Sequence, residues 1–285
     1  MSINFQIDAN SGTEKAPKLV MPNFIEDLIE LRDFARFHGF SGIDWSFDAR
    51  QLPQTPADIA EWVKGQQSLA PLEIRYHCPF IKVDIGHEDS REQAAAVDLF
   101  KQIIYLVAAA RGRFLTLHVG LGRDTTRILS WESTISNLKA LVQLGNENGI
   151  TVCLENLAWG WTSKPNLFEK LVRQSGAAVT FDIGHAHACD TVNSQQYSAK
   201  DFVTPHYHWV YNAHIYHTEI PGTGHVPPDE IEDINERLRI LDRTPCNWWV
   251  LELRERKGLL QTKSVIDDYL TQNSIIKEGH IQMAH

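Results

Sequence analysis

The stretch that decides the fold runs from residue 150 to residue 182 and reads ITVCLENLAWGWTSKPNLFEKLVRQSGAAVTFD. It begins with an apolar, β-branched run at 150–155, which is typical of a buried strand. A helix is predicted at 165–174, and a second strand-like run follows at 178–182. A strand, a helix and another strand within about thirty residues predict a βαβ unit with parallel strands.

The same alternation extends over the whole chain. The predicted strands are residues 4–8, 42–45, 72–77, 114–118, 150–155, 178–182, 210–215 and 248–252. The predicted helices are residues 23–37, one starting at Thr55-Pro56, one capped by residues 90–93, then 131–146, 165–174, 199–203, 228–241 and one from 264.

Eight strand–helix units predict an α/β fold, the (β/α)8 TIM barrel, in a single domain over residues 1–272. Residues 273–285 are expected to form a polar, frayed C-terminal tail. A doubly wound open sheet is the alternative, but it should carry a glycine-rich phosphate loop after its first strand. The segment at residues 10–12, Asn-Ser-Gly, does not supply one.

The composition excludes several classes of protein. The 285 residues carry a formal charge of −9, with 43% hydrophobic and 22% charged residues, so the chain is an ordinary globular protein. No apolar run is long enough for a membrane span, and the N-terminus does not read as a signal peptide. Four widely separated cysteines suit reduced thiols in a cytoplasmic protein. The acidic balance predicts that nucleic acid is not a partner, while the oligomeric state stays open.

Every predicted strand ends in an ionisable residue, and the carboxyl ends of parallel barrel strands meet at one face. These residues are Asp8, Asp44, His77, His118, Glu155, Asp182, His214 and Glu252. So many charged groups in one volume need a compensating charge, which a divalent metal supplies. The mixture of imidazoles and carboxylates suits zinc, manganese or iron.

The alternative for a single strand-end histidine is an ordinary hydrogen-bonding role. For the set Glu155, Asp182, His214 and Glu252, a metal site is the better interpretation, whereas Asp8 and Asp44 could instead cap loops. Trp159, Trp161 and Trp209 are expected in loops at the same face, either packing over the barrel mouth or forming a wall for a bulky ligand. Cys78 is expected to point into the core.

Several segments resemble the metal-dependent barrels that include the sugar phosphate isomerases and epimerases and endonuclease IV. The most specific is Phe181-Asp182-Ile183-Gly184-His185-Ala186. The others are Gly39-Phe40-Ser41-Gly42-Ile43-Asp44, Leu154-Glu155-Asn156, Ala213-His214-Ile215 and Leu251-Glu252.

The resemblance implies metal ligands and catalytic groups. Glu155, Asp182, His214 and Glu252 match the ligands of the isomerases' single metal, and Glu155 and Glu252 match their acid/base pair. His77 and His118 look like the histidines of a second metal in endonuclease IV, and His185 and His225 like ligands of its third. The family's aspartate two residues before that last histidine is here Thr223, so His217, Glu219 or Asp229 would have to replace it.

Paired metals favour hydrolysis of a phosphodiester, because one ion makes hydroxide at neutral pH and both neutralise charge at phosphorus. The predicted enzyme is therefore a phosphodiesterase-type hydrolase with two or three zinc or manganese ions. Its expected catalytic residues are Glu155, Glu252 and His185, and its expected substrate-binding residues are Arg123, Trp159, Trp161, Lys164 and His217.

The expected substrate is a small or medium-sized phosphodiester and not DNA, because no basic track is present. The family includes cobamide-remodelling phosphodiesterases, and the nucleotide loop of a cobamide is one candidate. Two alternatives stay open. One is a metal-dependent sugar isomerase, epimerase or dehydratase that uses the two glutamates as acid/base pair, and the other is a non-catalytic barrel that binds a metal or a sugar.

Overall fold

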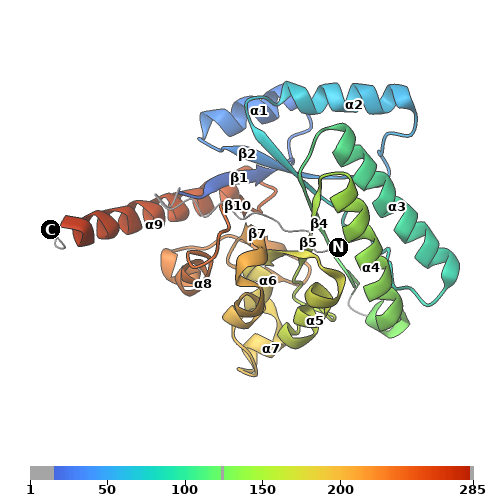
Figure 1. The fold of residues 1–285 in the computed structure, drawn as a ribbon. Helices are drawn as coiled ribbons and strands as arrows, with labels where there is room; N and C mark the ends of the chain where they lie inside the picture. The colour runs from blue at the N-terminus through green and yellow to red at the C-terminus, as the bar shows by residue number, and fades with distance from the viewer. Residues whose placement is uncertain (1–15, 123–124, 283–285) are drawn as a thin grey trace.

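A closed barrel of eight parallel strands, flanked by helices, forms the centre of the molecule (Figure 1). The computed structural model describes residues 16–122 and 125–282. The strands follow one another around the barrel as β1-β10-β7-β6-β5-β4-β3-β2. Their bounds are β1 Lys18–Pro22, β2 Gly42–Ser46, β3 Glu73–His77, β4 Phe114–Leu117, β5 Thr151–Glu155, β6 Ala178–Asp182, β7 Val210–Ile215 and β10 Trp248–Leu251. The predicted single-domain TIM barrel is confirmed.

The first barrel strand is not the predicted one. It is β1, whose residues Leu19, Val20 and Met21 are buried between β2 and β10, so residues 18–22 hold the barrel position that was predicted for residues 4–8. Those residues, Asp8 among them, lie outside the described part of the chain. The run at 18–22 ends at Pro22, which has no backbone N–H to donate, so the sequence marks it less clearly as a strand. It also ends without an ionisable residue.

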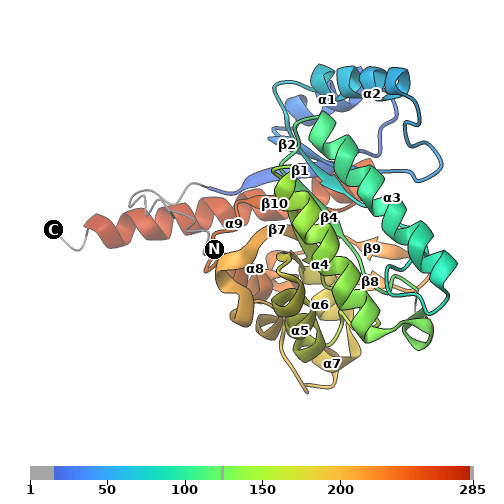
Figure 2. The same ribbon diagram turned by 45° about the vertical axis from the view of Figure 1, so that its right-hand side comes forward.

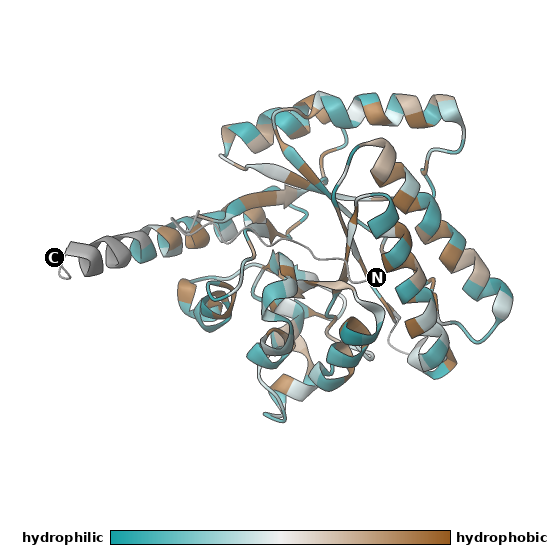
Figure 3. Ribbon diagram, viewed as in Figure 1, coloured by the Kyte–Doolittle hydropathy of each residue, from teal (hydrophilic) through white to brown (hydrophobic). Residues whose placement is uncertain are grey.

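The helices of the first half cover the barrel much as predicted. They are α1 Leu28–Phe37, α2 Pro56–Ser68, α3 Ser90–Ala109, the short η1 Thr125–Ile128, α4 Trp131–Glu147 and α5 Pro165–Ser175. Thr55 caps α2 in a reciprocal capping box with Asp58, while α3 is capped by Asp89 and not by Ser90. Hydrophobic residues recur among hydrophilic ones along α3 and α4 (Figure 3), which is the pattern of helices packed on one side.

The second half departs further from the prediction. The helix expected at 199–203 is the short η2 Ala199–Phe202, and three unpredicted short helices accompany it: α6 Ile183–Ala188, α7 Asp190–Asn193 and η3 Thr204–Trp209. An unpredicted hairpin, β8 Thr218–Ile220 and β9 Gly224–Val226, follows β7 (Figure 2). The helix expected at 228–241 is split into η4 Ile231–Asp233 and α8 Asn235–Leu241.

The last helix, α9 Arg256–Gln282, starts earlier than expected and continues past residue 272, where a frayed tail was expected. Its first half buries Leu259, Ile266 and Tyr269 against the barrel, and its end extends away from it (Figures 1 and 2). No helix in the described residues is both long and apolar enough to cross a membrane.

A polar layer lies inside the barrel, one step below the ends of the strands. The Arg75 guanidinium lies 3.9 Å from the Phe114 ring centre and 4.5 Å from that of Trp248, and it donates to the Asn212 side chain. Asn212 in turn donates to Thr116 and Thr180. Residues two apart on a strand face the same way. The side chains two positions after Arg75, Thr116, Thr180 and Asn212, on β3, β4, β6 and β7, therefore also point into the barrel.

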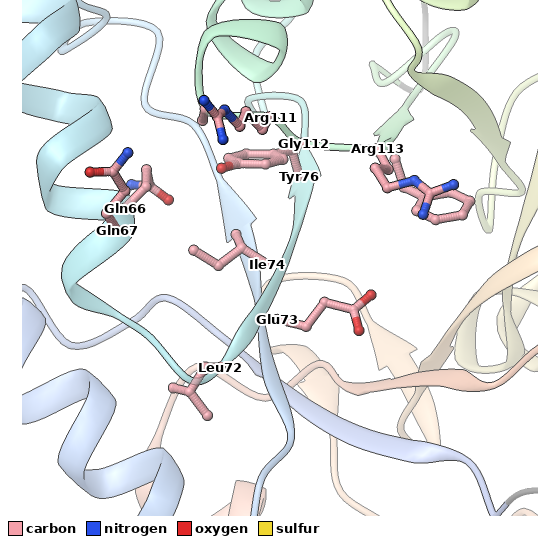
Figure 4. Close-up of a pocket in the computed structure, with 11 residues that line it drawn as sticks. Gln66, Gln67, Leu72, Glu73, Ile74, Tyr76, Arg111, Gly112 and Arg113 are labelled. Carbon is pink, nitrogen blue, oxygen red and sulfur yellow. The ribbon is translucent and has the colours of Figure 1, made fainter.

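The barrel's amino-terminal end carries a pocket of about 370 Å³ between α2, α3 and β3 (Figure 4). Gln66, Glu73, Tyr76 and Arg111 help to line it. Since β3 begins at Glu73 and ends at His77, this pocket lies at the end opposite the predicted metal ligands. It is therefore separate from the candidate site.

Candidate metal centre

Six of the predicted ligands meet at the carboxyl ends of the barrel strands. They are His77, His118, Glu155, Asp182, His214 and Glu252, and each is at most 6% exposed. The strand register places them side by side, as where Asp182 on β6 is level with His214 on β7. Together with His185 and His225 they fall into ligand groups whose N and O atoms lie within 4.8 Å of one another.

The first group joins His77, His118 and Glu155. The Nε2 atoms of both histidines lie 3.0 Å from Glu155 Oε2. The other ring nitrogen of His77, Nδ1, is 2.8 Å from the Cys78 carbonyl oxygen, to which it donates when protonated. That contact turns Nε2 towards Glu155 and leaves it able to act as a ligand. Cys78 is buried, as predicted, but its Sγ also lies 3.6 Å from His118 Nδ1.

The second group uses the other oxygen of the same glutamate. His214 Nδ1 lies 3.1 Å from Glu155 Oε1, 3.0 Å from Glu252 Oε2 and 3.7 Å from Asp182 Oδ2. The Glu155 carboxylate thus has one oxygen in each group. A carboxylate in this position could bridge two cations.

The third group joins His185 on α6 with Glu219 and His225 of the β8–β9 hairpin. Glu219 pairs directly across the hairpin with His225, and its Oε2 lies 2.6 Å from His185 Nε2. Thr223 is exposed and belongs to none of the ligand groups. Of the three candidate replacements for an aspartate at that position, the structure therefore brings Glu219 to the site.

Backbone contacts orient the two histidines of this group. His185 Nδ1 lies 3.0 Å from the Asn156 carbonyl oxygen, and His225 Nδ1 lies 2.8 Å from that of Glu252. The His225 ring also stacks on Tyr216, with 3.9 Å between centres and 9° between planes. Both Nε2 atoms are left for a ligand role.

The buried charges shift one another's pKa values. Burial would lower the pKa of His118, but Cys78 and Glu155 outweigh it and raise the pKa to about 9. Burial would likewise lower the pKa of His185, and Asp182 and Glu219 raise it to about 9. In the opposite sense, burial raises the pKa of Glu252, but His214 outweighs it, so the net pKa is lowered.

The ligand groups fit a divalent metal by their chemistry and by what they leave unpaired. Asp182 Oδ2 and His214 Nε2 are buried polar atoms without a hydrogen-bond partner in the described residues, while Glu219 Oε2 and Glu252 Oε2 each face a histidine nitrogen, at 2.6 and 3.0 Å. Buried polar atoms are normally paired, and a bound cation would supply a partner for such atoms. Mixed imidazole nitrogens and carboxylate oxygens suit zinc, manganese or iron.

The predicted substrate-binding residues do not gather in one place at the barrel mouth. The Trp159 ring lies 5.7 Å from that of His185, at the mouth, with its Nε1 donating to the Leu121 carbonyl oxygen. Trp161 packs edge-on against Trp131 at 5.1 Å, which is a packing role. Lys164 is exposed at the start of α5.

The other candidates do not join the mouth. His217 contacts the ring of His187 at 5.1 Å and lies outside the ligand groups. Trp209 immediately precedes β7, so it lies at the amino-terminal end of the barrel and the expectation that it faces the mouth is wrong. Arg123 lies outside the described residues.

Sequence reasoning missed two supports of the site and left a third undecided. Asn156 exchanges two hydrogen bonds of 2.9 Å with the backbone of Asp182, which holds the ends of β5 and β6 together. Phe80 stacks on His77 with 4.8 Å between ring centres. Asp44 does not cap a loop: it is 2% exposed, its Oδ1 has no partner in the described part, and burial raises its pKa.

Comparison with solved structures shows the same architecture in several enzymes. A D-tagatose 3-epimerase-like protein matches with TM-score 0.66 and 18% identity over 92% of this chain and 99% of its own. An L-ribulose 3-epimerase matches with TM-score 0.66 and 15% identity over 93% and 97%. Endonuclease IV from Thermus thermophilus matches with TM-score 0.64 and 13% identity over 88% and 100%. At these identities the likeness concerns the fold.

Two further comparisons rest on sequence. The uncharacterized protein MJ0008 of Methanocaldococcus jannaschii is 30% identical over 200 residues, which are 69% of this chain and 80% of that protein. The model of the xylose isomerase-like TIM barrel family matches residues 32–278. The chain therefore belongs to the xylose isomerase-like TIM barrel family.

Proposed function

We propose that the chain is a metal-dependent hydrolase of a phosphodiester that is not a nucleic acid. The observation that carries the proposal is the shared carboxylate of Glu155, whose Oε2 faces His77 and His118 while its Oε1 faces His214. Divalent cations held there would polarise the phosphoryl group and neutralise the charge that develops on phosphorus. A site for a single cation would not need the two extra histidines.

The protein's own residues would supply position and a dry environment. His77, His118 and Glu155 would hold one cation, and Glu155, Asp182, His214 and Glu252 another. His185, Glu219 and His225 would hold a further cation or contact phosphoryl oxygens. Because these groups are almost all buried, their interactions with a bound phosphoester are stronger than they would be in water.

The substrate class follows from charge. With a net charge of −9 the chain has no excess of cations for a long polyanion, so a small or medium-sized diester is preferred over DNA. Trp159 beside His185 offers an aromatic surface for a bulky group. A cobamide, whose nucleotide loop contains a phosphodiester, is one such substrate.

A second candidate function is isomerisation or epimerisation of a sugar. Glu155 and Glu252 flank His214 with contacts of 3.1 and 3.0 Å, so they could act as an acid/base pair around one cation. Epimerases among the similar structures favour this candidate. A non-catalytic barrel that binds a metal or a sugar is the third.

One set of assays separates these candidates. Protein stripped of metal and reloaded with Zn²⁺ or Mn²⁺ is offered bis(p-nitrophenyl) phosphate, a cobamide, and D-fructose or D-tagatose in D2O. We expect release of p-nitrophenol or a cobamide phosphate product, and no deuterium in the sugars.

The variant His77→Ala is expected to lose one equivalent of metal and nearly all hydrolysis. Deuterium exchange into a sugar that persists in His77→Ala, without ester cleavage by the wild type, would favour the epimerase. Metal binding without either reaction would favour the binding protein.

A further inference from the structure

The mouth of the barrel carries an arginine that the ligand groups do not use. Arg254 lies two residues beyond Glu252, in the loop after β10, and is exposed. We propose that Arg254 and Ser46 form a subsite for a second phosphate group on the substrate, beside the scissile diester. This inference rests on the proposed function and names a feature of its substrate.

The guanidinium is held in place by a fixed partner. Arg254 Nη2 donates to Ser46 Oγ at 2.8 Å. Ser46 is the last residue of β2, and its backbone N–H and C=O both bond to the Asn23 side chain, at 2.9 and 3.0 Å. A long side chain anchored to a fixed hydroxyl loses less freedom on binding a ligand than a free one would.

Phe80 connects this arginine to the metal ligands. The Arg254 Cζ lies 5.1 Å from the centre of the Phe80 ring, and that ring stacks on His77 at 4.8 Å and 22°. The Arg254 guanidinium thus contacts Phe80, and Phe80 contacts His77 of the first ligand group. A ligand whose reacting phosphate lies at the ligand groups would have its neighbouring substituent near Arg254.

Charge distinguishes Arg254 from the arginines around it. Arg256 is paired with Glu30 and Arg50 with Asp48, whereas Arg254 has no carboxylate partner within the described residues. The ligand groups nearby are rich in carboxylates, which would repel an anionic substituent. An arginine without a carboxylate partner at the edge of such a site therefore favours an anion at that position.

The donors match a phosphate better than a carboxylate. A guanidinium offers a planar pair of N–H donors to two oxygens. Ser46 Oγ accepts from Arg254, and its own O–H has no acceptor in the part of the chain described, so it is a third donor. A terminal phosphate has three acceptor oxygens and a carboxylate has two.

The test compares two chromogenic diesters that differ by one phosphate. They are thymidine 3′-(p-nitrophenyl phosphate) with a 5′-hydroxyl and the same compound with a 5′-phosphate. For the Mn²⁺-loaded wild type, we expect the 5′-phosphate to lower KM by about 10- to 100-fold with little change in kcat. Arg254→Gln should remove this preference and leave kcat and KM for the 5′-hydroxyl compound unchanged.

Two controls separate recognition from structure. Arg254→Lys should keep part of the preference, since it keeps the charge and loses the planar fork. Arg256→Gln makes the same charge change two residues away and should keep the preference in full. A wild type without preference, or an Arg254→Gln variant in which both substrates lose kcat and metal content falls, would overturn the inference.

A binding measurement keeps the test independent of turnover. Thymidine 3′,5′-bisphosphate and thymidine 3′-monophosphate are titrated calorimetrically into the Mn²⁺-loaded protein. The bisphosphate should bind about tenfold tighter to wild type and equally to Arg254→Gln. Equal binding by wild type refutes the subsite even if both diesters are cleaved. Absence of cleavage with the binding difference intact would refute only the proposed hydrolysis.

Discussion

Replacement of Gly184 by alanine tests how the packing of Tyr216 supports the third ligand group. Gly184 lies between Asp182 and His185, and a Cβ at this position would be 2.1, 2.4 and 2.5 Å from three ring atoms of Tyr216. Tyr216 is fully buried and stacks on His225 at 3.9 Å between ring centres, so its ring cannot shift without displacing His225. Overpacking of a closed site costs about 1–3 kcal/mol, and contacts this short place Gly184→Ala at the upper end.

We therefore expect the free energy of unfolding to fall by about 3 kcal/mol and Tm by roughly 5 °C or more. The metal of the third ligand group should also be lost, because His225 is displaced with Tyr216. Denaturant unfolding of metal-free protein and metal analysis after dialysis measure the two effects.

Gly65→Ala in α2 is the matched control for Gly184→Ala. Its new Cβ meets one flexible side-chain atom of Leu28 at 3.1 Å, so its unfolding free energy should stay within about 1 kcal/mol of wild type. A Gly184→Ala protein as stable as wild type, with full metal content, would refute the reasoning.

Three further predictions concern the ligands and their supports. Glu219→Gln should lose one metal equivalent, with metal affinity at the third ligand group lowered at least about 100-fold. The control variant Glu232→Gln should lose none, and equal metal content in the two variants would contradict the assignment. Metal-free protein should lose stability as pH rises from about 6.5 to about 9, because the folded pKa values of His118 and His185 are raised to about 9 and their stabilising charge is lost there. Thermal unfolding in EDTA at a series of pH values measures this, and a Tm that stays flat or rises would contradict it. Asn156→Ala should lower the free energy of unfolding by about 2–4 kcal/mol, since it leaves a backbone N–H and C=O at the end of β6 unpaired. Urea unfolding measures this, and a decrease of less than about 1 kcal/mol would contradict it.

The barrel and most of its strand ends could be predicted because both depend on local pattern. Apolar runs of strand length mark the strands, and the parallel topology brings their carboxyl ends together whatever the details of packing. Thus Glu155, Asp182, His214 and Glu252 could be placed at one mouth from the sequence. The strand β1 could not, because its run ends in Pro22 with no ionisable residue, and it is recognisable only from its pairing with β2 and β10.

The remaining features depend on contacts between distant parts of the chain. Glu219 reaches the third group of candidate ligands through the register of the β8–β9 hairpin, which no strong turn or strand pattern in the sequence predicts. The subsite at Arg254 joins residues of β2, of the loop after β3 and of the loop after β10. Such a cluster becomes visible only when the three strand ends are in place.

The distribution of the ligands along the chain has a consequence for synthesis. The first ligand group comes from the consecutive strands β3, β4 and β5, whereas the second needs Glu252, after β10. In a growing polypeptide, the residues of the first candidate group are therefore all present before Glu252 of the second is made. The second candidate group is complete only when β10 pairs with β1 and β7 and closes the ring, so any cation held there would depend on the last strand of the barrel.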